Sequence, residues 1–331
     1  MTEPPADHDP DRRAERRRGP AGPPAPTADF SDLVAPVVVA CSGGADSVAL
    51  LVLAAEAGLA PVAVHVDHGL RADSAGDVDV VRRDAETLGV AWRSVRVAVG
   101  AGPNLEARAR DARYGALRVA CEELDASAIL VAHTADDQAE TVLLNVLRGS
   151  AATGLAGMAR RRGDIVRPLL HLRRADVRAV VAALSLGTVD DPTNADVRWR
   201  RAWIRHEVLP MLGQGSERDL VPVLARQAEL LRAESDLLDE LGDDLLTDAG
   251  AETPSTRVLR AAPVALARRA LRRWLGAPPP SADEIERVLA VVRGEHVAAE
   301  LAGGRRVRRS HGRLHHDDVV VTPRPEDGTV R

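Results

Sequence analysis

Lysine is missing from this sequence of 331 residues, so all 44 of its basic residues are arginine. Without lysine, the chain cannot form a Schiff base or carry a nucleotide on its own side-chain amine. The phosphate loop with the pattern G-x-x-x-x-G-K-S/T is excluded as well, because its lysine contacts the phosphates. No lysine chemistry of the protein itself can therefore explain its function.

Cysteine and aromatic residues are also scarce. The two cysteines, Cys41 and Cys121, lie far apart and form no CxxC pair. This spacing excludes a disulfide framework and a four-cysteine zinc or iron–sulfur site within the chain. Aromatic residues make up 2% of the chain and hydrophobic residues 45%, so we expect cores that are filled mainly by Leu, Val and Ala.

Long hydrophobic runs are absent too. No apolar stretch approaches the roughly 18 residues that a bilayer span needs, and no apolar segment follows the N-terminal arginines, as a secretory signal would require. We therefore expect no membrane partner and a cytoplasmic location.

The first half of the chain alternates between two patterns. Residues 1–28 are rich in Pro, Asp, Arg and Ala without periodic apolar positions, which predicts a disordered tail. From residue 37, short β-branched runs alternate with segments of helical apolar spacing. This alternation predicts an α/β fold with a parallel sheet covered by helices on both faces. The predicted strands are 37–40, 61–66, 92–99 and 128–132, and the predicted helices are 46–57, 77–88, 105–124 and 135–147.

The second half has a different pattern. A looser region at 150–196 precedes a mainly helical region at 199–246, and short β-like runs at 298–321 predict a small α+β C-terminal module. Within the helical region, pairs of apolar residues recur every seven positions, at Val223/Leu224, Leu230/Leu231 and Leu237/Leu238. This repeat is compatible with a coiled-coil homodimer, but it favours a long helix packed within its own chain.

The strongest local pattern is a predicted strand that leads directly into Ser42-Gly43-Gly44-Ala45-Asp46-Ser47 and then into a helix. Glycines let the backbone turn tightly and bring amide groups against an anion. The helix N-terminus adds amide donors and a partial positive charge. Ser42 and Ser47 supply hydroxyl donors, and Asp46 can hold a Mg²⁺ that bridges phosphates. A capped turn also uses Ser and Asp, but the whole pattern favours phosphate binding.

Polar residues follow the second predicted strand and lie in the third predicted helix. The spacing of His65, Asp67 and His68 could ligate a metal, but it favours a polar loop at the carboxyl edge of the sheet. Arg113 and Tyr114 could meet a phosphate or a base, and the residue types alone leave a purely structural role equally open.

Three carboxylates and a histidine begin the fourth predicted helix, in the block Ala132-His-Thr-Ala-Asp-Asp-Gln-Ala-Glu-Thr141. The helix dipole stabilises carboxylates in a first turn, which is one explanation. Asp136 and Glu140 share a face, and Asp137 lies three residues before Glu140. Together with His133, they suit magnesium, a cationic substrate or proton transfer, and we favour a functional role.

Arginine and tryptophan alternate near residue 200, in the run Arg198-Trp199-Arg200-Arg201-Ala202-Trp203-Ile204-Arg205. Arginines would meet RNA phosphates and tryptophans would stack on bases. A solvated helix surface explains the composition equally well.

Taken in order, these blocks resemble the tRNA(Ile)-lysidine synthase family of PP-loop ATP pyrophosphatases. The loop at 42–47 indicates only the superfamily, whereas the block at 132–141 is far more specific. The resemblance is strong over residues 30–212 and continues weakly to 314. It implies a Rossmann-like PP-loop catalytic domain at 29–212, and a helical linker with a C-terminal tRNA-binding domain at 213–331. The other matching blocks are His65–Arg71, Asn104–Tyr114, Arg167–Leu170 and Asp191–Asn194.

The resemblance implies a two-step ligase. ATP would adenylate the C2 oxygen of the wobble cytidine in tRNA(Ile) with a CAU anticodon, with release of pyrophosphate. The ε-amine of free L-lysine would then displace AMP and give lysidine. The roles implied are ATP binding by residues 42–47, Mg²⁺ binding by Asp46 and Asp137, and lysine binding by Asp137 and Glu140. The implied catalytic residues are Asp46, Arg113, His133, Asp137 and Arg205, and the implied tRNA-binding residues are Arg113, Arg201 and Arg205.

Two departures from the family and three alternatives remain. Ala202 stands where the family usually has Asn, which leaves an amide contact in doubt, and the additional C-terminal domain of longer members is expected to be missing.

A tRNA-thiolating PP-loop enzyme would normally need catalytic cysteines. A non-catalytic RNA-binding module would explain only the arginines. A metal-dependent hydrolase could use His65, Asp67, His68, His133 and Asp137, but it does not explain the phosphate loop.

Overall fold

The computed structural model describes residues 26–69, 74–100, 102, 105–189 and 196–317. The chain divides into two compact units, one formed by residues 1–149 and 157–226 and the other by residues 150–156 and 227–331. The tail expected at 1–28 lies mostly outside the described residues. The last part of this tail makes a contact, because the Thr27 carbonyl pairs with His171. Directly after the tail, the backbone amide of Asp29 donates to the Pro168 carbonyl.

The first unit is built on a six-stranded sheet with the strand order β3-β2-β1-β4-β6-β5. All strands are parallel except β5, which pairs antiparallel with β6. The four strands expected from the sequence are confirmed, but the β5–β6 pair lies in the region that was expected to be irregular. The strands are β1 Val37–Ala40, β2 Pro61–Asp67, β3 Ala91–Arg96, β4 Ile129–Leu130, β5 Arg161–Arg162 and β6 Ile165–Val166.

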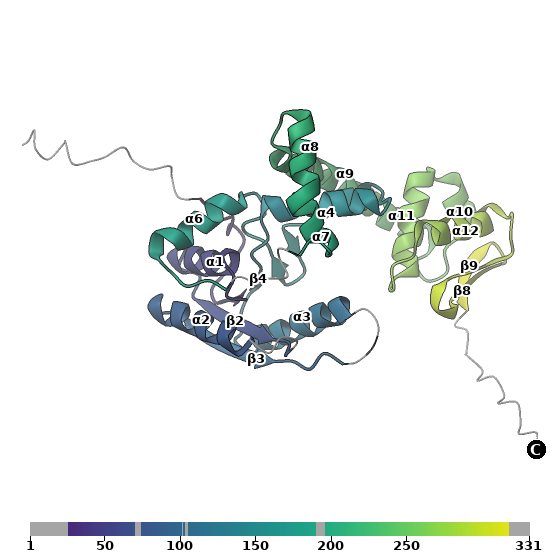
Figure 1. The fold of residues 1–331 in the computed structure, drawn as a ribbon. Helices are drawn as coiled ribbons and strands as arrows, with labels where there is room; N and C mark the ends of the chain where they lie inside the picture. Colours follow the sequence, from purple (N-terminus) through teal and green to yellow (C-terminus); the bar gives the residue numbers. More distant parts are fainter. Residues whose placement is uncertain (1–25, 70–73, 101, 103–104, 190–195, 318–331) are drawn as a thin grey trace, which may run out of the picture. The chain divides into compact units, whose positions relative to one another are not determined.

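Helices cover both faces of this sheet (Figure 1), which confirms the predicted α/β architecture. Side chains alternate along β1, so Val37 and Val39 face one core and Val38 and Ala40 face the other. The first core also contains residues of α1, α2 and α6, and the second contains residues of α3. The helices are α1 Ala45–Glu56, α2 Ser74–Thr87, α3 Leu105–Glu123, α4 Ala135–Leu147 and α6 Arg174–Leu184.

A helical segment completes the first unit. It runs through α7 Arg200–Trp203, a π-helical turn at Ile204–Val208, α8 Leu209–Ser216 and the start of α9 Leu220–Ala249. Ala135 and Ala139 of α4 pack against Val221 and against half-buried residues of α8 and α9. This packing brings the arginine-rich helix α7 next to the first turns of α4.

The second unit is a small α+β module, as expected. Its core is formed by apolar residues of α9, of the helices α10 to α12 and of an antiparallel sheet with the order β7-β8-β9. Trp274 stacks on His316 with ring centroids 4.0 Å apart. The elements are the short α5 Ala152–Leu155, α10 Thr256–Ala261, α11 Val264–Leu275, α12 Ala282–Arg293, β7 Ala298–Glu300, β8 Arg306–Ser310 and β9 Arg313–Asp317.

The helix α9 carries the repeat of seven residues found in the sequence. Ala228, Ser235 and Leu246 are buried within the chain. The first member of each apolar pair stays exposed, with exposed fractions of 38% for Val223, 62% for Leu230 and 56% for Leu237. Among the described residues, no helix combines the length and apolarity that would cross a bilayer.

Candidate active site

The loop between β1 and α1 has the shape of an anion-binding turn. Gly43 has a φ of 81°, and a Cβ there would lie 2.9 Å from a methyl of Val189, so glycine is required. The Ser47 hydroxyl donates to the Gly44 carbonyl over 2.8 Å and accepts the Ser42 amide over 3.2 Å. No side chain of the described residues caps the N-terminus of α1, which leaves its first amides available to phosphate oxygens.

The first turn of α4 holds Asp137 by a capping box. The amide and the hydroxyl of Thr134 both donate to Asp137 Oδ2 over 2.9 Å. The other oxygen, Oδ1, accepts a hydrogen bond of 2.8 Å from Arg174. Burial alone would raise the pKa of Asp137, but the guanidiniums of Arg174 and Arg201 outweigh it and lower this pKa to about 2. Asp137 is therefore ionised at neutral pH.

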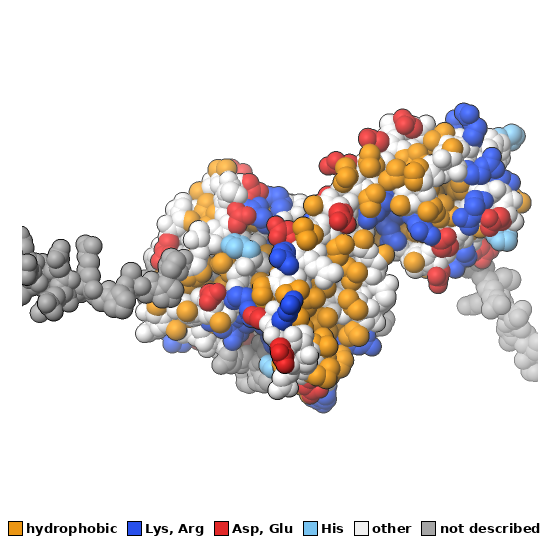
Figure 2. All heavy atoms as spheres, turned by 90° about the horizontal axis from the view of Figure 1, so that it is seen from above, with side chains coloured by type: hydrophobic (Ala, Val, Ile, Leu, Met, Phe, Trp, Pro, Cys, Tyr) orange, Lys and Arg blue, Asp and Glu red, His pale blue; other side chains and the backbone are white. Residues whose placement is uncertain are grey.

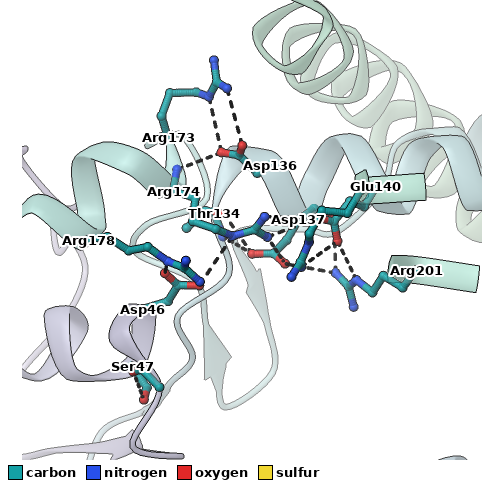
Figure 3. Close-up of polar contacts among 12 residues, drawn as sticks. Asp46, Ser47, Thr134, Asp136, Asp137, Glu140, Arg173, Arg174, Arg178 and Arg201 are labelled. Carbon is teal, nitrogen blue, oxygen red and sulfur yellow. Dashed lines mark hydrogen bonds and ion pairs between the residues drawn. The ribbon is translucent and has the colours of Figure 1, made fainter. Parts of the chain in front are cut away.

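Glu140 is the centre of a cluster of guanidiniums, part of which is drawn in Figure 3. Its side chain is 1% exposed. It accepts hydrogen bonds from Arg174 over 3.2 Å, from Arg201 Nε over 2.9 Å and from Arg205 Nε over 2.7 Å. A buried carboxylate requires such partners. The two carboxylates predicted to bind lysine thus converge, and both are already paired with arginines.

Asp46 lies at the start of α1 and also faces arginines. Arg178 Nε donates to its Oδ1 over 3.0 Å, and Arg174 Nε lies 3.6 Å from its Oδ2. In the described part of the chain, no group of three or more His, Cys, Asp or Glu side chains could hold a metal. Asp46 and Asp137 offer oxygen donors, which suit a Mg²⁺ whose remaining ligands are phosphates and water.

His133 is a neutral hydrogen-bond donor. Burial lowers its pKa to about 3, and the positive charge of Arg167 acts in the same direction. Arg167 Nε donates to His133 Nδ1 over 3.3 Å. The proton must then be carried by Nε2. His133 can therefore donate a hydrogen bond to an oxygen without carrying a charge.

Arg113 is the cationic residue on α3 whose role the sequence left open. Burial lowers its pKa, and the neighbouring positive charge of Arg110 acts in the same direction. Within the described parts of the chain it makes no ion pair, whereas Arg110 lies over the ring of Tyr114 at 5.0 Å. An arginine without a carboxylate partner is suited to an incoming phosphate.

The residues around His65 do not form a metal centre in the described part of the chain. His65 is buried and its Nδ1 pairs with the Cys41 carbonyl over 3.0 Å. Asp67 accepts the Gly69 amide over 2.8 Å and lies 3.8 Å from Arg96. These contacts organise a polar loop at the sheet edge, which is the interpretation that the sequence favoured.

The arginines of α6 belong to the site, although no pattern in the sequence singled them out. The carboxylate of Asp136 accepts the backbone amide of Arg174 over 2.8 Å and pairs with the side chain of Arg173 (Figure 3). The hydrogen bond from the Arg174 amide ties the start of α6 to the start of α4, and Arg174 and Arg178 of this helix reach Asp46 of the phosphate loop. The helical spacing of Val177, Val181 and Leu184 was a signal that could have revealed this helix.

A cavity of about 330 Å³ lies beside Glu140 in the first unit. Its walls combine charged side chains, among them Asp136, Glu140 and Arg174, with apolar ones such as Leu209 and Leu220. In Figure 2, basic and acidic side chains lie next to one another on the face seen from above, with hydrophobic side chains around them. A small molecule with an alkyl chain and charged ends would fit these walls.

The fold and the family models define the class of protein. Residues 30–212 match the model described as a PP-loop domain, and residues 255–315 match the TilS substrate binding domain. The solved U34-tRNA thiolase of Methanococcus maripaludis has a TM-score of 0.51 at 18% identity over 62% of this chain and 76% of that chain, which shows a shared fold. The protein is a PP-loop enzyme that uses ATP.

Curated relatives define the particular family. The tRNA(Ile)-lysidine synthase of Nocardia farcinica is 42% identical over 77% of this chain and 81% of its own length. The enzyme of Salinispora arenicola is 42% identical over 88% of this chain and 92% of its own length. The enzyme of Thermus thermophilus is 41% identical over 88% of this chain and 57% of its own length. The chain belongs to the tRNA(Ile)-lysidine synthase family.

Proposed function

We propose that the chain forms lysidine in tRNA(Ile) in two steps at the carboxyl edge of the six-stranded sheet. In the first step, the C2 oxygen of the wobble cytidine bonds to the α-phosphorus of ATP, and pyrophosphate leaves. In the second step, the ε-nitrogen of lysine bonds to C2, the amine loses a proton, and AMP leaves with the former C2 oxygen. The observation that carries this proposal is the phosphate loop in a chain that matches both family models.

The phosphate loop supports the first step. Its glycines and the uncapped start of α1 present amides that would hold the departing pyrophosphate. A bound Mg²⁺ would neutralise charge on the phosphates. Asp46 and Asp137 would hold the ion, because both are carboxylates that can donate oxygen ligands. Asp46 belongs to the phosphate loop, and Asp137 contacts the same arginine, Arg174, as Asp46 does.

His133 and two arginines, Arg113 and Arg205, would stabilise the negative charge that develops on the phosphates as the wobble cytidine is adenylated. His133 donates from Nε2 without adding a charge, and Arg113 supplies a cation that is not neutralised by a carboxylate among the described residues. Arg205 lies on the π-helical turn and reaches Glu140. Donors fixed in place before the reaction stabilise a developing anion more effectively than mobile water.

Free lysine would occupy the cavity beside Glu140. Its alkyl chain suits the apolar side chains of Leu209 and Leu220, which line the cavity together with Glu140. Its ammonium group would pair with Glu140 and with Asp137, which shares Arg174 with Glu140. Because these carboxylates now pair with arginines, binding of lysine requires some of these contacts to be exchanged. This requirement was not visible in the sequence.

The tRNA would meet the exposed side of α7. Trp199 is 53% exposed and Trp203 is 37% exposed, so both rings are available for stacking on unpaired bases. Arg201 and Arg205, which were predicted to bind tRNA, point to Glu140 instead. For these two arginines, tRNA contact stays a prediction that requires them to leave the carboxylate.

A homodimer and a cytoplasmic location complete the proposal. The exposed residues Leu230 and Leu237 of α9 would form the dimer contact. Light scattering of the wild type and of Leu230→Glu tests this contact. A monomeric mass for both proteins would contradict it.

The function is tested by incubating the protein with ATP, lysine and tRNA(Ile) transcripts that carry a CAU anticodon. We expect AMP release that requires both lysine and tRNA, and a lysidine nucleoside in the mass spectrum of the digested tRNA. Formation of a thiolated nucleoside would favour the thiolase alternative. Binding of tRNA without AMP release would leave only a binding module.

A further inference from the structure

Arg174 is the side chain that joins the phosphate loop to the carboxylates of α4. It begins α6, and its side chain is 12% exposed. Its guanidinium lies 3.6 Å from Asp46 of α1, 2.8 Å from Asp137 and 3.2 Å from Glu140. One cation therefore contacts three carboxylates that come from two separate helices (Figure 3).

The hydrogen bonds of Arg174 are unequal. Its terminal nitrogens donate to Asp137 and Glu140, whereas its buried Nε makes no hydrogen bond to any residue that the structure describes. The carboxylates raise the pKa of Arg174 although burial opposes them, so the group stays charged. A buried charge with one unsatisfied donor, next to a phosphate loop, can gain a further partner there.

The same carboxylates are those that the proposed reaction needs for other cations. Lysine would place an ammonium group at Asp137 and Glu140, and Asp46 would take part in binding Mg²⁺. Asp137 and Glu140 are already shared by Arg174, Arg201 and Arg205, so an ammonium group there would add a fourth positive charge to the same two carboxylates. The guanidinium of Arg174 also contacts Asp46 of the phosphate loop, so we expect Arg174 to be displaced when lysine binds.

We propose that Arg174 is the counter-cation of the substrate-free site, that it competes with lysine for Asp137 and Glu140, and that it moves onto the phosphates of ATP. This inference rests on the proposed function. Arg174 already contacts Asp46 of the phosphate loop, and a guanidinium binds phosphate oxygens through two parallel hydrogen bonds. ATP binding would thereby release the two carboxylates for lysine, and Arg174 would act as a positioning residue.

Opposite shifts of two Michaelis constants test this proposal. In Arg174→Ala and in Arg174→Gln, loss of the cation should raise the KM for ATP by about tenfold or more and lower the KM for lysine by about threefold or more. Arg174→Lys restores the charge and should return both constants toward the wild-type values. Calorimetry with lysine alone, without ATP, should show tighter binding to Arg174→Gln than to the wild type.

The matched control is Arg173→Ala. Arg173 is the preceding residue and pairs with Asp136 and Asp219, but with none of the three carboxylates that Arg174 contacts. Both constants of this variant should stay within about twofold of the wild type.

Three outcomes would overturn the proposal. They are a parallel rise of both constants, an unchanged KM for lysine in both neutral variants, and a lysine affinity in calorimetry that falls. If Arg174→Ala does not fold, Arg174→Gln and Arg174→Lys still show whether the KM for ATP and the KM for lysine shift in opposite directions or in parallel. If the wild type forms no lysidine, the proposed function fails, whereas a fully active wild type with parallel shifts in the variants refutes only the role of Arg174.

Discussion

Replacing Glu140 by glutamine should destabilise the protein as well as weaken lysine use. Because Glu140 is expected to bind lysine, Glu140→Gln should raise the KM for lysine with adenylation retained. In the structure, however, the carboxylate is 1% exposed and is the shared partner of Arg174, Arg201 and Arg205. The substitution therefore leaves three guanidiniums with one fewer counter-charge.

The size of this loss follows from the geometry. A charge-assisted hydrogen bond contributes about 1.5–3 kcal/mol, and removal of one partner of a buried pair costs about 3–5 kcal/mol. Arg201 is 40% exposed and can recover contacts with water. We therefore expect the free energy of unfolding to fall by roughly 2–4 kcal/mol, which corresponds to a Tm lower by about 4–16 °C.

Thermal unfolding followed by circular dichroism measures the effect, with Glu207→Gln as the control. Glu207 is an exposed carboxylate on the adjoining π-helical turn, so its loss should move the Tm by less than about 2 °C. The KM for lysine should be measured well below the Tm of Glu140→Gln. A Tm of Glu140→Gln equal to that of the control would refute the assignment of Glu140 as the centre of the arginine cluster.

Three further predictions concern the loop, the histidine and the tryptophans. Asp46→Asn should nearly abolish pyrophosphate release, measured at several Mg²⁺ concentrations, and full turnover with an unchanged magnesium requirement would contradict its role. His133→Gln should lower kcat by about 10- to 100-fold. In the wild type, a pKa of about 3 keeps this imidazole neutral above that pH, so kcat should show no histidine titration between about pH 5 and 8. A titration of kcat near the ordinary histidine pKa would count against the role of His133. Trp199→Ala should raise the KM for tRNA by about 5- to 100-fold, since stacking of one base contributes about 1–3 kcal/mol; an unchanged KM for tRNA in a filter-binding or kinetic assay would remove this residue from the RNA surface.

Local patterns in the sequence determined the elements on which the site is built. The strand β1 coincides with the apolar run at 37–40, and α4 coincides with the predicted helix at 135–147. Both agree because burial on two faces requires a continuous apolar strand and because a Thr-x-x-Asp start gives a capping box. The phosphate loop at 42–47 could likewise be recognised from consecutive residues, because its serines, glycines and aspartate lie directly between the predicted strand and the predicted helix. These signals act over a few positions, so a single sequence contains them in full.

Tertiary structure alone decided how the charges of the site are paired. Asp137 and Glu140 meet arginines that lie 34 to 68 residues further along the chain. No spacing rule relates these positions, because their distance depends on how α4, α6 and α7 pack together. For an arginine on a helix surface, the sequence gives no means to distinguish a solvated side chain from one that is buried against a carboxylate. The residue types at the site could be read from the sequence, but the saturation of its carboxylates by guanidiniums emerged only when the helices were assembled around the sheet.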